Sequence, residues 1–192
     1  MKHFERWGKR MLSALAAAAV LAATPMGAKG AEKSAVESAS ANRYIDVQLL
    51  GINDFHGQLN VTRKIGGREV GRADYLAAYL KQREAENKNT LLVHAGDAVG
   101  ASPPVSALLQ DEPTIEVLNK LGFDVGTLGN HEFDEGTAEM LRLIHGGYHP
   151  ATGDFAGADF PYVSANVVDK ETKKPILPPY VIKRVNGMPI GF

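Results

Sequence analysis

Three short stretches of this sequence carry side chains that bind divalent cations. Residues 53–57 read Asn-Asp-Phe-His-Gly, residues 96–97 read Gly-Asp, and residues 129–132 read Gly-Asn-His-Glu. Carboxylate and amide oxygens mixed with imidazole nitrogens suit hard or borderline ions such as Zn²⁺, Mn²⁺ or Fe²⁺. Two such ions held ~3.5–4 Å apart activate a water molecule and clamp a phosphoryl group. The residue types therefore predict a two-metal phosphoesterase centre.

The spacing assigns a role to each predicted ligand. Asp54 and His56 are separated by one residue, so their side chains point the same way in an extended backbone and can bind one cation. The two oxygens of Asp97 can bridge two cations, and Asn130 offers a neutral carbonyl oxygen. We predict these four residues as the metal ligands.

His131 and Asp134 form a second predicted pair, with a catalytic role. The imidazole of His131 can stabilise charge on phosphoryl oxygens or protonate the leaving oxygen. Asp134 lies three residues later and can hold that imidazole in one tautomer. The other histidines are assigned elsewhere: His94 to the core or to a position behind the ligands, and His145 and His149 to the surface.

Each motif follows a short apolar segment, and these segments set the expected fold. We predict strands at 44–52, 90–94 and 123–128, and helices at 71–87 and 137–145. A further helix is expected between Thr114 as its N-cap and Gly122 as its stop. Strands that alternate with helices indicate an α/β fold built from βαβ units. Ligands from several strand ends then meet at the carboxyl edge of the sheet.

The rest of the chain gives weaker signals. Residues 146–159 contain four Gly, one Pro and two Asp, which predicts a loop or an insertion. Strands are predicted at 161–168, at 180–185 and from 188 to the end, with Asn186-Gly187 as the hairpin turn between the last two. The basic side chains Arg63, Lys64, Arg68 and Arg72 are interpreted as a solvated loop.

The first 30 residues have the composition of an export signal. Four Lys/Arg in the first ten residues precede a 13-residue apolar run at 11–23, which fits the ~7–15 residues of a signal-peptide core. A membrane-anchoring helix is the alternative, but a span needs ~20 apolar residues. We predict a signal peptide at 1–30, a linker at 31–43 and a catalytic domain at 44–192, with no stable membrane insertion after cleavage. The expected location is secreted, periplasmic or cell-wall-associated.

Charge and composition exclude several classes of partner. Residues 31–192 contain 16 Lys/Arg and 21 Asp/Glu, a net charge of −5. A nucleic acid polymer is bound through a basic face, so we expect no such partner. A small phosphate-bearing substrate is compatible with this charge, because bound metals supply positive charge locally. The sequence contains no cysteine, which excludes disulfide and thiolate chemistry.

Four stretches together resemble the 5′-nucleotidase family of calcineurin-like metallophosphoesterases: residues 50–57, 95–97, 121–134 and 164–167. The resemblance runs over residues 44–192. It implies a four-layer α/β/β/α sandwich, of which this chain holds the N-terminal portion. It also implies that Asp54 and His56 bind the first metal, that Asp97 bridges, that Asn130 binds the second metal, and that His131 and Asp134 form the catalytic dyad. Members of this family are exported and hydrolyse extracellular nucleotides.

The chain departs from that family in two respects. Family members complete the metal site with further histidines, and often a Gln, from a later part of the chain, whereas no His follows His149 here. A C-terminal domain that binds the nucleotide base is also missing, so we expect the catalytic domain to be incomplete at its C-terminus. The resemblance implies a small nucleotide as substrate, either a 5′-monophosphate or a 2′,3′-cyclic or 3′-phosphate. Two alternatives stay open: a SoxB-type thiosulfohydrolase, and an inactive truncated fragment that binds metal weakly.

Overall fold

A computed structural model describes residues 44–192 of the protein. The predicted signal peptide at 1–30 and linker at 31–43 lie outside the described residues. Within 44–192, no helix combines the length and the apolar character that crossing a membrane requires.

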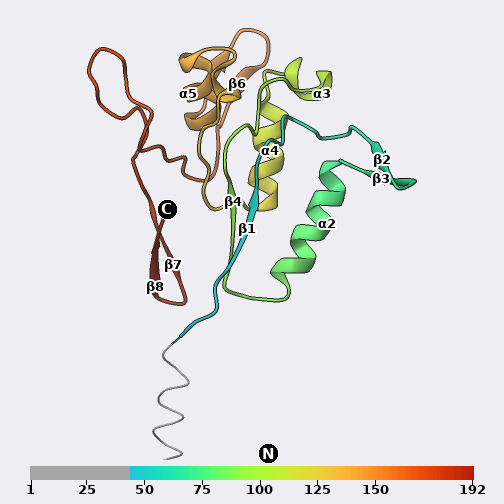
Figure 1. The fold of residues 1–192 in the computed structure, drawn as a ribbon. Helices are drawn as coiled ribbons and strands as arrows, with labels where there is room; N and C mark the ends of the chain where they lie inside the picture. Colours follow the sequence, from blue (N-terminus) through green and yellow to red (C-terminus); the bar gives the residue numbers. More distant parts are fainter. Residues whose placement is uncertain (1–43) are drawn as a thin grey trace, which may run out of the picture. The chain divides into compact units, whose positions relative to one another are not determined.

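Two parallel strands form the centre of the fold. β1 (Gln48–Ile52) pairs with β4 (Thr90–His94), and the register places the first residue of each strand opposite the other. α2 (Ala73–Glu84) lies between the two strands in the sequence and beside them in space (Figure 1). These three elements form the expected βαβ unit, although β1 and α2 are each shorter than predicted.

Two predicted strands are reduced to isolated bridges. One parallel bridge joins β4 to the segment at 123–128, and another joins that segment to 161–168. Both segments therefore extend the sheet through single bridges and do not form full ladders. One reason lies in Asp124, whose carboxylate accepts a hydrogen bond from the backbone amide of Leu92 at 2.9 Å. That side chain takes up a donor of β4 that a continuous ladder would use. The length of these strands was therefore overestimated from the sequence.

Four helical elements follow β4 in the described part of the chain, and the second and fourth of them were predicted from the sequence. They are α3 (Pro104–Ala107), α4 (Glu112–Leu121), the 3-10 turn η1 (His131–Phe133) and α5 (Thr137–His145). Gly122 ends α4 with a φ of 78°, as expected of a helix stop. Thr114 lies inside α4, fully buried and hydrogen-bonded to Ser106, so the prediction of Thr114 as N-cap was wrong. A proline in the first turn, Pro113, suits a start upstream of Thr114 because its φ is already helical.

Three antiparallel hairpins complete the described elements. They are β2 (Arg63–Ile65) with β3 (Arg68–Val70), β5 (Gly147–His149) with β6 (Gly153–Phe155), and β7 (Ile182–Val185) with β8 (Met188–Gly191). The turn at Asn186 and Gly187 has φ values of 49° and 83°, as the Asn-Gly signal predicted. The segment at 146–159, predicted as a loop or an insertion, is not a simple loop because it holds the β5–β6 hairpin. The basic segment is likewise a hairpin, β2–β3, and its basic side chains are exposed except that of Arg72, which is part-buried.

The core lies where α2, β4, α4 and α5 face one another. Its buried members include Leu80, Leu92, Leu118, Phe123, Met140, Phe160 and Tyr162. Burying an apolar side chain of this size contributes roughly 1.5–3 kcal/mol. His94 belongs to the same region, in contact with three of the aromatic rings, which agrees with its predicted place in the core. Its Nε2 has no hydrogen-bond partner among the described residues, and burial lowers the pKa of His94 to about 4.

An ion cluster around the buried side chain of Arg142 joins two helices and the β5–β6 hairpin. The guanidinium of Arg142 donates to Glu112 at 2.6 Å and to Glu139 at 2.7 Å, and the hydroxyl of Thr152 donates to Glu112 at 2.6 Å. The buried guanidinium is thus paired with carboxylates, which a buried charge requires. The cluster fixes α5 against α4, and α5 directly follows the third motif in the sequence.

Candidate metal centre

The first two motifs lie side by side because hydrogen bonding continues past the ends of β1 and β4. The amide of Asp54 donates to the carbonyl oxygen of Gly96 at 3.2 Å, and the amide of His56 donates to the carbonyl oxygen of Asp97 at 3.0 Å. Both motifs therefore leave neighbouring parallel strands at the same edge of the sheet, where open α/β folds place their sites.

The third motif joins them through a side chain and two glycines. The amide of His131 donates to Oδ1 of Asp97 at 2.9 Å. A Cβ on Gly129 would lie 2.2 Å from the same oxygen, and a Cβ on Gly96 would lie 2.5 Å from the amide nitrogen of Gly129. Only glycine allows so close an approach of the two loops.

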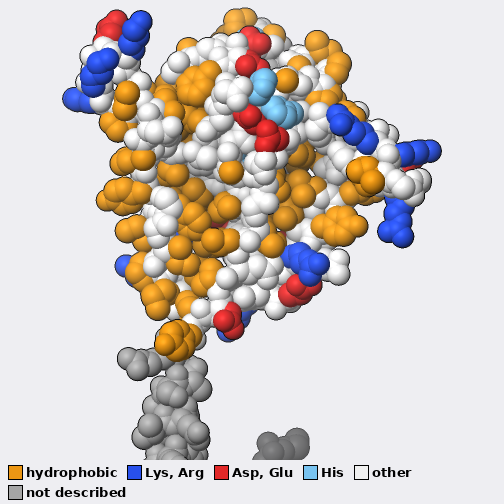
Figure 2. Space-filling model, in the orientation of Figure 1, with side chains coloured by type: hydrophobic (Ala, Val, Ile, Leu, Met, Phe, Trp, Pro, Cys, Tyr) orange, Lys and Arg blue, Asp and Glu red, His pale blue; other side chains and the backbone are white. Residues whose placement is uncertain are grey.

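Three side chains converge where these loops meet. One ligand atom each from His56, Asp97 and His131 lies within 4.8 Å of the other two. Nitrogen and oxygen ligands of Zn²⁺ lie ~2 Å from the ion, so the donors around one cation are about 4 Å or less apart. The donor types of this set, two imidazole nitrogens and a carboxylate oxygen, suit a divalent cation. Figure 2 shows histidine side chains bordered by acidic ones on this part of the surface.

The orientation of His56 suits a metal ligand. Its Nδ1 lies 2.9 Å from the carbonyl oxygen of Gly100, which can only accept, so Nδ1 carries the proton. Nε2 is then left with its lone pair, 3.8 Å from Oδ1 of Asp54. A backbone carbonyl that fixes the tautomer in this way is a common support for a ligating histidine.

The other two predicted ligands lie at the margin of this cluster. The side chain of Asp54 is 58% exposed and accepts a hydrogen bond from the side-chain amide of Asn53. Asn130 is exposed and immediately precedes η1. The structure therefore brings His56, Asp97 and His131 together, places Asp54 beside His56, and leaves Asn130 at the surface next to His131.

His131 and Asp134 form the predicted contact. Nδ1 of His131 lies 2.8 Å from Oδ2 of Asp134, and the ring of His131 stands at 86° to the ring of His56, with the centroids 4.8 Å apart. The hydrogen bond to Asp134 raises the pKa of His131 above its ordinary value. The carboxylate thus holds a proton on Nδ1 and leaves Nε2 for other contacts.

Glu132 is an important residue of the site, and it was not assigned a role from the sequence. It is 5% exposed, and its Oε2 accepts the amides of Asp97 at 2.9 Å and Gly129 at 2.6 Å. Its Oε1 accepts the amide of Ala98 at 2.8 Å. Its place in the motif, directly after a predicted catalytic histidine, was the available signal. A second such residue is Asp111, whose carboxylate accepts a hydrogen bond from the amide of Gly100 at 3.1 Å. No motif in the sequence pointed to this role for Asp111.

The backbone itself is unusual at the predicted ligands. Asp54, His56 and Asp97 have φ values of 52°, 46° and 51°, in the left-handed region that few non-glycine residues occupy. The extended backbone predicted for Asp54 and His56 was therefore wrong, because β1 ends at Ile52. A residue held in the left-handed region costs on the order of 1–3 kcal/mol, and such residues cluster at functional sites. The hydrogen bonds between the three motifs are what hold these conformations.

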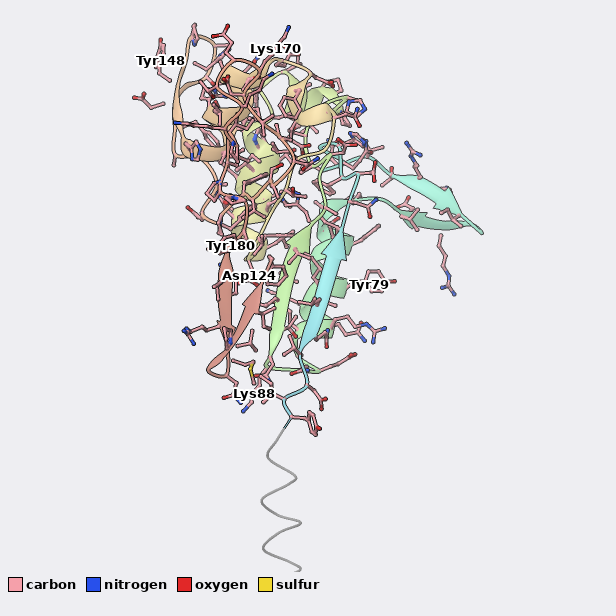
Figure 3. All side chains as sticks on the ribbon, turned by 60° about the vertical axis from the view of Figure 1, so that its left-hand side comes forward. Tyr79, Lys88, Asp124, Tyr148, Lys170 and Tyr180 are labelled. Carbon is pink, nitrogen blue, oxygen red and sulfur yellow. The ribbon has the colours of Figure 1, made fainter. Side chains whose placement is uncertain are left out.

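A cavity of about 870 Å³ opens beside the first motif. Asp54 and His56 contribute to its lining, together with residues of α2 and of the β2–β3 hairpin. Tyr79 of α2 points outward on the side from which that hairpin projects (Figure 3). Of the predicted basic loop, Arg63 and Arg72 reach the cavity, and Arg72 is bound to Asp74 at 2.6 Å.

Comparison with known proteins gives a consistent family. The family model described as calcineurin-like phosphoesterase matches residues 47–180. The chain is 50% identical over 157 residues to Endonuclease YhcR of Bacillus subtilis, covering 78% of this chain and 13% of that protein. It is 32% identical to the 2′,3′-cyclic-nucleotide 2′-phosphodiesterase/3′-nucleotidase of Salmonella typhimurium, covering 74% of this chain and 22% of that protein.

A solved structure shares the fold. Haemophilus influenzae NAD nucleotidase matches with a TM-score of 0.60 at 28% identity, over 77% of this chain and 26% of that one. The chain spans about a quarter or less of the length of these three proteins.

Proposed function

The chain belongs to the calcineurin-like phosphoesterase family, and on that premise we propose that the protein is an exported, metal-dependent phosphoesterase that hydrolyses nucleotides. The proposed substrates are 5′-monophosphates, or 2′,3′-cyclic and 3′-phosphates. The observation that carries the proposal is the convergence of His56, Asp97 and His131 at one edge of the sheet. Two of the similar proteins are named as nucleotidases, which supports the choice of nucleotide esters.

We assign Asp54 and His56 to one divalent cation, Asp97 to a bridging position and Asn130 to a second cation, with Zn²⁺ or Mn²⁺ as suitable ions. Two contacts support this assignment. The proton on Nδ1 of His56 is committed to Gly100, which leaves Nε2 free, and only one oxygen of Asp97 accepts a backbone amide among the described residues. Divalent cations held there supply positive charge for the phosphoryl oxygens and an activated water.

His131 acts on the substrate in this proposal. Asp134 holds the proton on Nδ1, so Nε2 is the atom that donates to a phosphoryl oxygen or protonates the leaving oxygen. The hydrogen bond between Nδ1 of His131 and Asp134 supports this role, because the carboxylate fixes the orientation of the ring. Asp134 does not touch the substrate; it orients the ring.

Export and domain organisation form part of the same proposal. The signal peptide at 1–30 and the linker at 31–43 would deliver a catalytic domain at 44–192 outside the cytoplasm. The basic start and the short apolar run of the first 30 residues support this organisation.

A second candidate is hydrolysis of phosphodiesters in nucleic acid. It is favoured by the 50% identity to a protein named an endonuclease. Against it stands the net charge of −5 over residues 31–192, because polymer binding requires neutralisation of several phosphates by basic side chains. We therefore rank the small nucleotide first.

The test is a set of parallel assays on the 192-residue protein with added Mn²⁺. We expect release of phosphate from AMP or 3′-AMP, or opening of 2′,3′-cyclic AMP, and loss of that activity with EDTA. Cleavage of single-stranded DNA or RNA without nucleotide hydrolysis would favour the endonuclease. Turnover of a sulfur ester alone would favour a thiosulfohydrolase, and metal binding without any turnover would identify an inactive fragment.

A further inference from the structure

One carboxylate connects the backbones of the second and third motifs. Glu132 is 5% exposed and accepts three amides, from Asp97 and Ala98 in one loop and from Gly129 in the other. We propose that Glu132 is a positioning residue that holds both loops in the metal-binding geometry before any cation arrives. This inference rests on the metal centre of the proposed function.

The local backbone explains why an anion is needed there. Gly96 and Asp97 have φ values of 96° and 51°, and the amides of Asp97 and Ala98 both point at the carboxylate of Glu132. Successive amides that converge in this way form an anion-binding concavity known as a nest. The carboxylate therefore stabilises the left-handed conformation of Asp97, which few non-glycine residues adopt.

The backbone conformation of Asp97 in turn determines the orientation of its side chain. With its backbone held by Glu132, Asp97 presents Oδ1 to the amide of His131. The first motif follows, because the amides of His56 and Gly57 donate to the carbonyl oxygens of Asp97 and Ala98 at 3.0 and 3.1 Å. The two residues that Glu132 holds therefore contact both neighbouring motifs.

Glu132 is unsuited to bind the metal itself. Both of its oxygens already accept amides, and its side chain is almost completely buried. Glutamine at this position would keep one accepting oxygen but would turn an N–H donor toward at least one backbone amide. Aspartate would keep the charge on a shorter side chain that cannot reach all three amides.

The experiment is calorimetric titration of Mn²⁺ into the 192-residue protein and its variants, at a temperature where circular dichroism shows each to be folded. We expect E132Q to weaken Mn²⁺ binding by about 10- to 100-fold, the range found for residues that support metal ligands, and E132D to fall between E132Q and wild type. E112Q is the matched control, because it also alters a carboxylate that is largely shielded from solvent and accepts two hydrogen bonds, on α4. It should lower the melting temperature and leave Mn²⁺ affinity unchanged.

Equal affinities of E132Q and wild type would overturn the inference, as would an equal loss in E112Q. A second measurement covers the case in which E132Q does not fold. In metal-free wild type, the amides of Asp97, Ala98 and Gly129 should exchange slowly by NMR, and fast exchange would also overturn the inference. Wild type that binds Mn²⁺ but hydrolyses no nucleotide would refute the proposed function alone, since the role of Glu132 is measured by binding.

Discussion

Oδ1 of Asp97 accepts a hydrogen bond from the backbone amide of His131 at 2.9 Å. The contact joins the side chain of the second motif to the backbone of the third, 34 residues later in the sequence. The candidate bridging carboxylate is therefore oriented by the same segment that carries the candidate catalytic histidine. Substitutions on either side of this contact should affect metal binding and catalysis together.

The charge of Asp97 can be tested separately from its hydrogen bond. In D97N the amide oxygen can still accept from His131, while the negative charge is removed. We expect Mn²⁺ affinity to fall by more than roughly 100-fold, beyond the range for residues that only support ligands. The free energy of unfolding should change by about 1 kcal/mol or less. Calorimetric titration and thermal unfolding measure the two effects, and an unchanged affinity would remove Asp97 from the ligand set.

Gly129 offers a steric test of the same contact. Its added Cβ would lie 2.2 Å from Oδ1 of Asp97, so alanine must displace that carboxylate. We expect G129A to lower Mn²⁺ affinity at least about tenfold and stability by about 1–3 kcal/mol. The control is G191A in β8, where an added Cβ meets no atom within 4 Å. Loss of affinity in G191A, or none in G129A, would contradict the geometry.

Asp134 should affect turnover more than substrate binding. D134N removes the carboxylate that holds the proton on Nδ1 of His131 at 2.8 Å. If His131 is the proton donor, kcat should fall by about 100-fold or more, as expected for loss of a general acid, with little change in KM. E135Q, at the exposed neighbouring position, should behave as wild type in the same steady-state assay. An unaffected kcat in D134N would exclude the dyad.

The lowered pKa of His94 predicts how the free energy of unfolding depends on pH. Its pKa is lowered to about 4 by burial, against about 6.5 in the unfolded chain. The unfolded state therefore binds the proton more readily. Protonation of His94 costs no stability above about pH 6.5, and the free energy of unfolding decreases progressively as the pH falls toward 4. The loss attributable to His94 is on the order of 3 kcal/mol.

Chemical denaturation at a series of pH values measures this loss. Replacement of His94 by leucine should flatten the curve between pH 6.5 and 4, whereas H145Q, at an exposed position, should leave it as in wild type. If H94L keeps the full slope, the acid sensitivity arises from other groups.

Local signals in the sequence were sufficient for several elements. α5 has the predicted bounds, and Gly122 ends α4 as predicted. Both features could be recognised because an apolar stripe and a helix-ending glycine are local patterns within one stretch of sequence. The parallel βαβ unit and the family resemblance were also predicted, and the match to residues 47–180 confirms the resemblance. The roles assigned to the individual ligands stay predictions until the variants above are measured.

Other features depend on contacts that no local pattern records. The β5–β6 hairpin uses three-residue strands, too short to show the alternation by which strands are recognised. Glu132 finds its partners 34 and 35 residues away, so its role follows from the meeting of two loops. Thr114 looked like a helix cap because the apolar stripe begins after it, whereas Pro113 and the contact with Ser106 place it inside the helix.

The left-handed backbone at Asp54, His56 and Asp97 also limits which amino acids evolution can place there. Glycine, asparagine and aspartate enter this region most easily, and β-branched residues are nearly excluded. A descendant of this chain that had lost its cations would therefore drift at these positions toward glycine and asparagine. Glycine or asparagine at these positions in an otherwise similar sequence would mark a pseudoenzyme that retains the backbone conformation but has lost metal binding and catalysis.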